Sequence, residues 1–191
     1  MLCVCLNAQN PNLKKGEIGL TFTPIGTYTL VTFSKGNYAE DKYKYLYSFG
    51  INYIFPLNNR LELETGIEFS KYNKKNYYPS HIPDGIYIYG GDDNLSFINI
   101  PINLRINFLK FFFFNTGTLI DLDFAKNNDI DNQTGLGLIL GLGAKYDFKS
   151  GISVFANPFV RCHSVISFAS DKYHERLIDA GVRFGITYNL K

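Results

Sequence analysis

The sequence has no tryptophan, one methionine and three cysteines among its 191 residues, and it contains no long apolar run. A membrane-spanning helix needs roughly 18 to 20 consecutive apolar residues, and no stretch approaches that length. Any membrane role must therefore use strands, whose backbone groups can pair with one another in a closed barrel. A chain of this length also leaves no room for a second core.

Two of the three cysteines lie in the short apolar start MLCVCLNAQN. This start is typical of the tail of a signal peptide, although the basic part of a complete signal is missing. We expect residues 1–8 to be the remnant of a signal that begins further upstream, and residues 9–191 to form one domain. The alternative is an irregular N-terminus of a cytosolic protein. The mature chain would keep only Cys162, which excludes a disulfide framework and a cysteine-rich zinc site.

Charge of neither sign dominates, because 19 basic side chains stand against 17 acidic ones. This balance gives no cationic field of the kind that attracts nucleic acid, so we expect no nucleic-acid partner. The abundant residues are 17 Phe, 17 Gly and 14 Tyr. Aromatic residues favour strands and glycine favours turns, so the composition predicts an all-β fold.

Apolar and polar residues alternate along eight stretches, which is the pattern of strands whose two faces meet different surroundings. In the first stretch this alternation places Tyr28 on the apolar face, with Thr27 and Thr29 opposite. The seventh is ambiguous, because Phe155 and Phe159 share their parity with polar residues. The stretches are 16–33, 43–56, 60–73, 95–109, 111–125, 136–148, 152–167 and 177–190.

The links between these stretches distinguish a soluble sandwich or barrel from a membrane barrel, which alternation alone does not do. Outer-membrane barrels have tight turns at one end and longer external loops at the other. The links at 57–59, around 110 and at 149–151 are tight, whereas those at 34–42, 74–94, 126–135 and 168–176 are long. We therefore predict an eight-stranded antiparallel up-and-down transmembrane β-barrel, with both termini at the short-turn end.

The polar face carries cations and anions in nearly equal number. Eight strands enclose a space that side chains can fill, and buried charges must be paired. We therefore expect a salt-bridged plug and no wide pore. Its members are Lys44, Arg60, Glu62, Glu64, Glu68, Arg105, Asp121, Asp123, Lys145, Arg161, Asp179 and Arg183.

The long link at 74–94 is the most aromatic external segment. Aromatic side chains supply large contact areas, so this link is the best candidate for contact with a ligand or partner. The alternative is an interfacial tyrosine belt with a short hairpin extension. The candidate residues are Tyr77, Tyr78, His81, Tyr87 and Tyr89.

The fourth stretch, FINIPINLRINF, resembles the Ile-Pro-x-x-Leu-(Lys/Arg) strand of the outer-membrane β-barrel domain family of Bacteroidetes, of which PorT-like proteins are a branch. The closing segment GVRFGITYNLK is similar to the final strand of that family. The resemblance covers about 16 to 191. It implies a location in the outer membrane and a barrel fold, and it implies little about activity.

Two kinds of chemistry compete with a purely structural role. His163, Ser164 and Glu175 supply the residue types of a Ser-His-acid hydrolase, and small barrels include lipid A deacylases. Neighbours in a strand point to opposite faces, however, so His163 and Ser164 would diverge unless a bulge intervenes. The acidic segments 90–94 and 127–132 have oxygen ligands suited to Ca²⁺, but neither matches an EF-hand. We expect no catalytic residues and no bound metal.

The series Gly137, Gly141 and Gly143 is not a phosphate loop, because no Gly-Lys-Ser/Thr follows. We interpret it as space for large side chains facing it inside the barrel.

The leading prediction is a non-enzymatic outer-membrane protein without cofactor. We expect it to be surrounded by outer-membrane lipid and to contact an envelope protein or an extracellular ligand through its loops. The alternatives are a lipid-modifying enzyme of the deacylase kind and a soluble lipocalin-like barrel that holds an apolar ligand.

Overall fold

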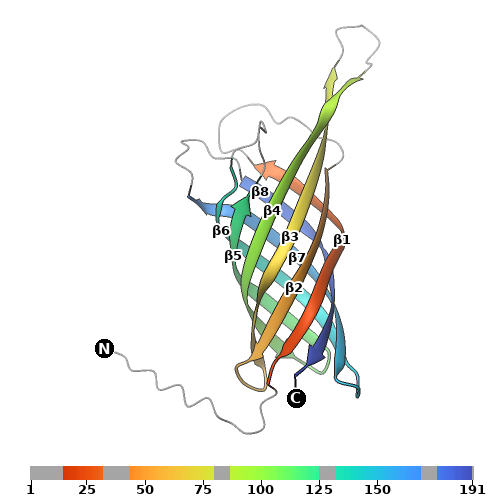
Figure 1. The fold of residues 1–191 in the computed structure, drawn as a ribbon, viewed down its shortest axis with the longest axis vertical. Helices are drawn as coiled ribbons and strands as arrows, with labels where there is room; N and C mark the ends of the chain where they lie inside the picture. Colours follow the sequence, from red (N-terminus) through yellow and green to blue (C-terminus); the bar gives the residue numbers. More distant parts are fainter. Residues whose placement is uncertain (1–14, 32–43, 80–86, 125–131, 169–175, 191) are drawn as a thin grey trace, which may run out of the picture.

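The computed structural model describes residues 15–31, 44–79, 87–124, 132–168 and 176–190, without the side chains of 30–31, 44, 74–79 and 87–93. Eight antiparallel strands close into one barrel in chain order (Figure 1). Among the described residues no helix is long and apolar enough to span a membrane. The strands are β1 Glu17–Val31, β2 Lys44–Pro56, β3 Leu61–Pro79, β4 Tyr87–Phe108, β5 Phe112–Asp123, β6 Gly135–Asp147, β7 Ile152–Ser167 and β8 Arg176–Asn189.

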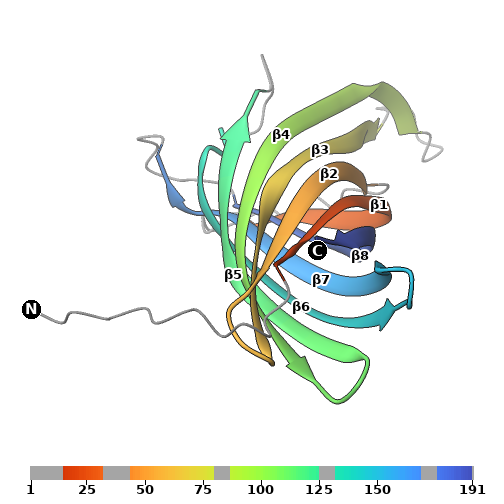
Figure 2. The ribbon, with the colours of Figure 1, turned by 60° about the horizontal axis from the view of Figure 1, so that its bottom comes forward.

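The strand that closes the barrel is β1, which pairs with both β2 and β8. Viewed with the lower end forward, the strands follow one another round the wall (Figure 2). The tight turns between β2 and β3, β4 and β5, and β6 and β7 lie at the lower end, where β1 begins and β8 ends (Figure 1). The predicted fold class and the predicted number of strands are confirmed. The prediction that the barrel begins and ends at the end with the tight turns is also confirmed.

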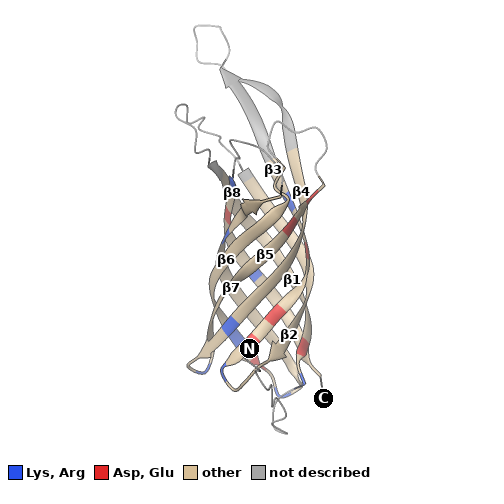
Figure 3. Cartoon of the chain, turned by 90° about the vertical axis from the view of Figure 1, so that its left-hand side faces the viewer, with Lys and Arg blue, Asp and Glu red and all other residues tan. Residues whose placement is uncertain are grey.

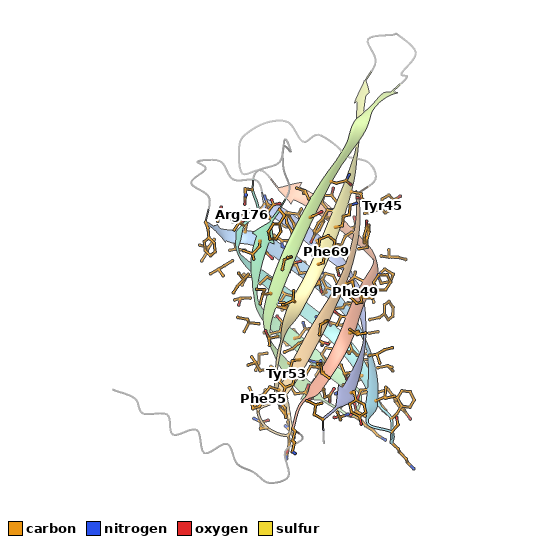
Figure 4. All side chains as sticks on the ribbon, viewed as in Figure 1. Tyr45, Phe49, Tyr53, Phe55, Phe69 and Arg176 are labelled. Carbon is orange, nitrogen blue, oxygen red and sulfur yellow. The ribbon has the colours of Figure 1, made fainter. Side chains whose placement is uncertain are left out.

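The barrel is apolar outside and polar inside, which is the reverse of a soluble protein. Phe49, Ile51 and Phe69 are each about half exposed, at 54%, 54% and 48%. Figure 4 shows the side chains of Phe49 and Tyr53 pointing away from the wall. In contrast, three charged residues of the strands are fully buried, namely Glu64, Arg105 and Asp121. Figure 3 shows where acidic and basic residues lie along the strands. A lipocalin-like barrel would have the opposite faces, so that alternative is excluded.

A bulge in β1 reverses which side chains of its upper half point outward and which point inward. The three steps from Thr23 to Gly26 in β1 span the same length as the two steps from Ser48 to Leu46 in β2. The pairing of β1 with β8 shifts at the same place. One extra residue changes the parity of every residue beyond it. Ile25 is consequently exposed, and Tyr28 is 4% exposed and points inward. The prediction that Tyr28 lies on the apolar outer face is therefore wrong.

A second bulge lies in β7 near the upper end. Leu136 pairs with Ile166 and Leu138 with Cys162, so β7 holds two more residues than β6 over this length. Ser164 has a φ of +49°, in the left-handed region that residues other than glycine and asparagine seldom adopt. Both His163 and Ser164 are buried as a result.

The segment between the third and fourth predicted strands is mostly an extended hairpin and not a loop. β3 continues to Pro79 and β4 begins at Tyr87, with a ladder that pairs Lys74 with Asp93 and Pro79 with Tyr87. Figure 1 shows this hairpin projecting beyond the upper ends of the other strands. The prediction of a long loop at 74–94 is therefore corrected, because the ladder continues through its polar residues.

Candidate functional site

The interior of the barrel holds three layers of charged side chains, of which the lowest lies at the short-turn end. The Lys145 Nζ lies 2.6 Å from a carboxylate oxygen of Glu17 and 3.4 Å from one of Asp147. The hydroxyl of Thr187 donates to Glu17 at 2.7 Å, and the hydroxyl of Ser153 donates to Asp147 at 2.6 Å. Residues from β1, β6, β7 and β8 are thereby tied together across the lumen.

The middle layer is centred on Glu64, which lies between two arginines. Arg183 approaches both carboxylate oxygens of Glu64, at 3.1 and 3.2 Å, and Arg105 lies 3.7 Å away. The Asn52 amide donates to Glu64 at 3.1 Å. The Arg105 guanidinium also lies 3.9 Å from the ring centroid of Phe113. A cation above an aromatic face is stabilised by the ring quadrupole, so the inward-facing phenylalanine supports the charged layer.

Two glycines make room for the aromatic rings of this layer. A Cβ on Gly143 would collide with the Phe113 ring, and a Cβ on Gly185 would collide with the Phe155 ring. Gly143 pairs with Phe113, and Gly185 pairs with Phe155, in the register of the barrel. The expectation that Gly143 leaves space for a large facing side chain is confirmed.

The upper layer combines an arginine, a histidine and a tyrosine with three carboxylates. Arg161 forms ion pairs with Glu68 and with Asp179, the latter at 3.3 Å. The Tyr72 hydroxyl donates to Asp179 at 2.5 Å. The His163 Nε2 lies 3.1 Å from Asp179, and its Nδ1 lies 2.9 Å from Asp121. Both ring nitrogens are thus engaged, and His163 is fully buried.

An apolar cluster packs around the upper layer. Tyr28 packs edge-on against Tyr72 with ring centroids 5.2 Å apart, and Phe97 lies 5.6 Å from the His163 ring. The members of this apolar cap are Tyr28, Leu46, Tyr72, Leu95, Phe97, Phe159 and Leu177.

The lumen between the layers is almost completely filled. The cavity found there among the described residues has a volume of about 10 Å³ and is lined in part by Glu68, Arg161 and Arg183. A space of that size is near the lower limit for a single water molecule. Between the layers, the described side chains therefore pack closely across the lumen.

The structure brings most of the predicted lumenal residues together, with three exceptions. Arg60 is exposed in the turn before β3, because the strand begins only at Leu61; its predicted lumenal position is wrong. Lys44 begins β2, and its side chain lies outside the described residues. Asp123 lies at the upper end of β5, where it accepts a hydrogen bond from the Gln133 backbone at 3.0 Å.

The predicted external contact residues are placed only by their backbone. Tyr77 and Tyr78 belong to β3, and Tyr87 and Tyr89 belong to β4, with Tyr77 paired to Tyr89. His81 lies outside the described residues.

Among the described residues no group of three or more His, Cys, Asp or Glu side chains is arranged to hold a metal. Of the two acidic segments, 90–94 is part of β4, and most of 127–132 lies outside the described residues.

Sequence reasoning missed the uncharged members of the network. Asn99 donates to Asp121 at 2.7 Å, the Ser70 hydroxyl donates to Asn99 at 2.6 Å, and Asn157 donates to Asn115 at 3.0 Å. Their parity within the strands is the same as that of the buried charges, which is the signal that would have found them.

A comparison with family models and with curated proteins gives no match. Solved structures that resemble the fold include the outer membrane protein AlkL in DMPC lipid bilayers, with 9% identity, 100% of this chain and 97% of that chain covered, and a TM-score of 0.49. Ail of Yersinia pestis has 11% identity, coverages of 92% and 99%, and a TM-score of 0.39. The N-terminal β-barrel domain of Pseudomonas aeruginosa OprF has 14% identity, coverages of 91% and 99%, and a TM-score of 0.35.

The class of the protein follows from the barrel's own faces. The closed wall has no unpaired edge, its exterior is apolar, and its interior holds paired charges. Such a wall satisfies every requirement for crossing a bilayer with strands. The chain is a small outer-membrane β-barrel protein, and its short turns mark the periplasmic end.

Proposed function

We propose that this barrel is a non-conducting, non-enzymatic membrane anchor that contacts an envelope protein or an extracellular ligand through its β3–β4 hairpin. The observation that carries the proposal is the length of this hairpin on a filled barrel. β3 has 19 residues and β4 has 22, whereas β5 has 12 and β6 has 13.

The excess length lies outside what a bilayer requires. A tilted strand crosses the bilayer with about 9 to 11 residues, so β3 exceeds the crossing by about eight. At a rise of about 3.3 Å per residue, the hairpin extends on the order of 25 Å beyond the membrane along its own axis. A two-stranded ribbon of this length is only marginally stable on its own in water, and contact with a partner would stabilise it.

The filled lumen supports a role outside the barrel. Solute transport through eight strands would require an open path, and the three layers with their apolar cap occupy the interior. Transfer of an acyl group at His163 would require a substrate to reach a ring that is fully buried and hydrogen-bonded on both sides. These contacts favour a structural role for His163 over the deacylase alternative.

We also propose that the chain belongs with the outer-membrane β-barrel domain proteins of Bacteroidetes. The Ile-Pro-x-x-Leu-Arg pattern lies in β4, where Pro101 is buried and lines the small lumenal cavity, and Arg105 joins the middle layer. Homologues that keep a proline and a basic residue at these two positions would support this placement, and their absence would remove it.

The function is tested by shortening the hairpin. A variant that lacks residues 75–91, with a two-residue turn joining the truncated strands, keeps every described charged layer. We expect it to fold normally and to lose the cross-linked partner that the full chain captures in intact cells. Equal capture by both chains would overturn the assignment of contact to the hairpin. The same purified proteins in a planar bilayer are expected to show no conductance steps, and steady conductance would overturn the non-conducting role.

A further inference from the structure

Two hollows adjoin at the periplasmic rim, and one is polar whereas the other is apolar. The polar hollow, which we call the rim pocket, has a volume of about 410 Å³ and is lined in part by Asn58, Asn59, Asn107 and Lys110. The apolar hollow, which we call the alanine groove, also measures about 410 Å³. Phe111 and Lys145 line both hollows. Because the Lys145 side chain lies in the lumen, the wall of β6 separates the hollows at that residue, and they approach each other over the rim at Phe111. The rim pocket is partly enclosed, and the alanine groove is shallower and more open to its surroundings.

The alanine groove is a depression in the lipid-facing wall. Its floor is the cross-strand pair of Ala144 in β6 and Ala156 in β7. Phe184 pairs with Ala156 on the other side, and Tyr146 pairs with Val154 one step nearer the periplasm. Small side chains are therefore surrounded by large ones, and the hollow opens toward the bilayer.

An alkyl chain suits this groove better than an empty space does. Side chains that line a void have no atoms opposite them and lose their dispersion contacts. The lining of the groove exposes almost only apolar surface. Since the wall faces lipid, the molecules that can fill the groove are those with long apolar chains.

The rim pocket supplies a cationic contact beside the groove. The Lys110 Nζ lies 5.1 Å from the centroid of the Phe111 ring, which stacks on Tyr146 at 5.9 Å. Both carboxylates of the pocket face cations already, because Glu62 lies 3.7 Å from Arg105 and Asp147 lies 3.4 Å from Lys145. No ion pair with Lys110 is found within the described part of the chain. A negatively charged group in the pocket would therefore meet Lys110.

Amide groups add hydrogen-bond donors to the same pocket. The side-chain oxygen of Asn58 accepts from the backbone nitrogens of Arg60 and Leu61, at 2.8 and 2.9 Å. This capping contact fixes the amide and leaves its NH₂ group to donate. Asn59 and Asn107 line the pocket beside it.

We propose that this rim binds one anionic phospholipid of the periplasmic leaflet. An acyl chain lies in the alanine groove, and the phosphate lies in the rim pocket against Lys110. The polar and apolar parts of the site meet at Phe111, as the two parts of a phospholipid meet at its glycerol. The site is separate from the external hairpin, so it goes beyond the proposed function.

The experiment counts lipids that remain bound to the full chain. The purified barrel in a non-ionic detergent is titrated with phosphatidylglycerol, and bound lipid is measured by native mass spectrometry. Ala144→Phe fills the groove, and Lys110→Gln removes the charge. Leu140→Phe, on the same face of β6, and Lys149→Gln, in the neighbouring turn, are the matched controls. A boiling-dependent shift on a gel verifies that each variant is folded.

We expect one lipid to bind the wild type and both controls more tightly than any further lipid. Lys110→Gln should weaken that lipid about fivefold, the loss expected for one lysine at a charged membrane surface. Ala144→Phe should weaken it to the level of the further lipids. Equal retention by all five proteins would show only unselective annular lipid and would overturn the proposal. Binding of inorganic phosphate that Ala144→Phe leaves unchanged would also overturn it, in favour of a free-anion site.

Discussion

Glu64 offers the sharpest test of the charged plug, because this carboxylate lies between two buried arginines. Glu64→Gln keeps the shape of the side chain and removes its charge. Arg183 then loses a partner that it contacts at 3.1 and 3.2 Å, and Arg105 keeps only Glu62, at 3.7 Å. Removing one partner of a buried ion pair costs about 3–5 kcal/mol, since it leaves an uncompensated charge.

The loss is measured as the free energy of unfolding in urea, with the protein refolded into lipid vesicles. Asp147→Asn is the matched control, because Asp147 lies in the same lumen but its side chain is 50% exposed. An exposed pair contributes at most about 1 kcal/mol, so the control should change little. The double variant Glu64→Leu/Arg183→Met removes the Glu64–Arg183 pair together and leaves Arg105 with Glu62, so it should recover part of the loss. A Glu64→Gln barrel within about 1 kcal/mol of the wild type would refute the reasoning.

Three further substitutions test separate parts of the account by the same unfolding measurement. Tyr72→Phe removes the hydrogen bond to Asp179 and should cost about 1.5–3 kcal/mol, as for other bonds to charged groups; an unchanged value would show that the upper layer does not depend on it. Leu140→Arg places a charge on the lipid face and should cost about 2–4 kcal/mol, whereas Lys149→Gln in the turn should cost almost nothing; similar values for the two would contradict the depth assigned to them. Gly185→Ala directs a Cβ into the Phe155 ring and should cost about 1–3 kcal/mol by overpacking, and Phe155→Leu introduced with it should recover part of that loss; a neutral Gly185→Ala would contradict the packing.

Strand alternation predicted most of the barrel because each strand separates lipid from a polar interior. The alternation that exposes Phe49 and Ile51 buries Asn52, which has the opposite parity in β2, and it buries Glu64 in the paired strand β3. Charged residues with this parity were predictable as lumenal. The sequence could not predict which of these charged residues contact one another, because the contacts join strands far apart in the sequence, such as Glu17 with Lys145.

The alternation of apolar and polar residues could not predict the bulges or the ends of the strands. The extra residue near Ile25 changes the parity of Tyr28 without any change in composition, so only the register reveals it. The same applies to His163 and Ser164, which a simple strand would send to opposite faces. Phe155 and Phe159 contradicted the pattern because inward aromatic rings lie against arginines, as Phe159 does with Arg161 at 4.2 Å.

The length of the hairpin had a signal in the sequence that alternation does not use. Lys74 and Lys75 pair with Asp93 and Asp92 in the register. Opposite charges at paired positions stabilise neighbouring strands. Polar residues in this segment suggested a loop, whereas the complementary order of their charges is consistent with a ladder that continues beyond the membrane.

The central claim is the orientation of the two faces, and the absence of tryptophan makes it directly measurable. Phe49→Trp places a single fluorophore on the outer face, and Phe97→Trp places one in the apolar cap inside the barrel. In vesicles with brominated acyl chains, which quench tryptophan on contact, we predict strong quenching at position 49 and almost none at position 97. Quenching at position 97 with none at position 49 would contradict the account.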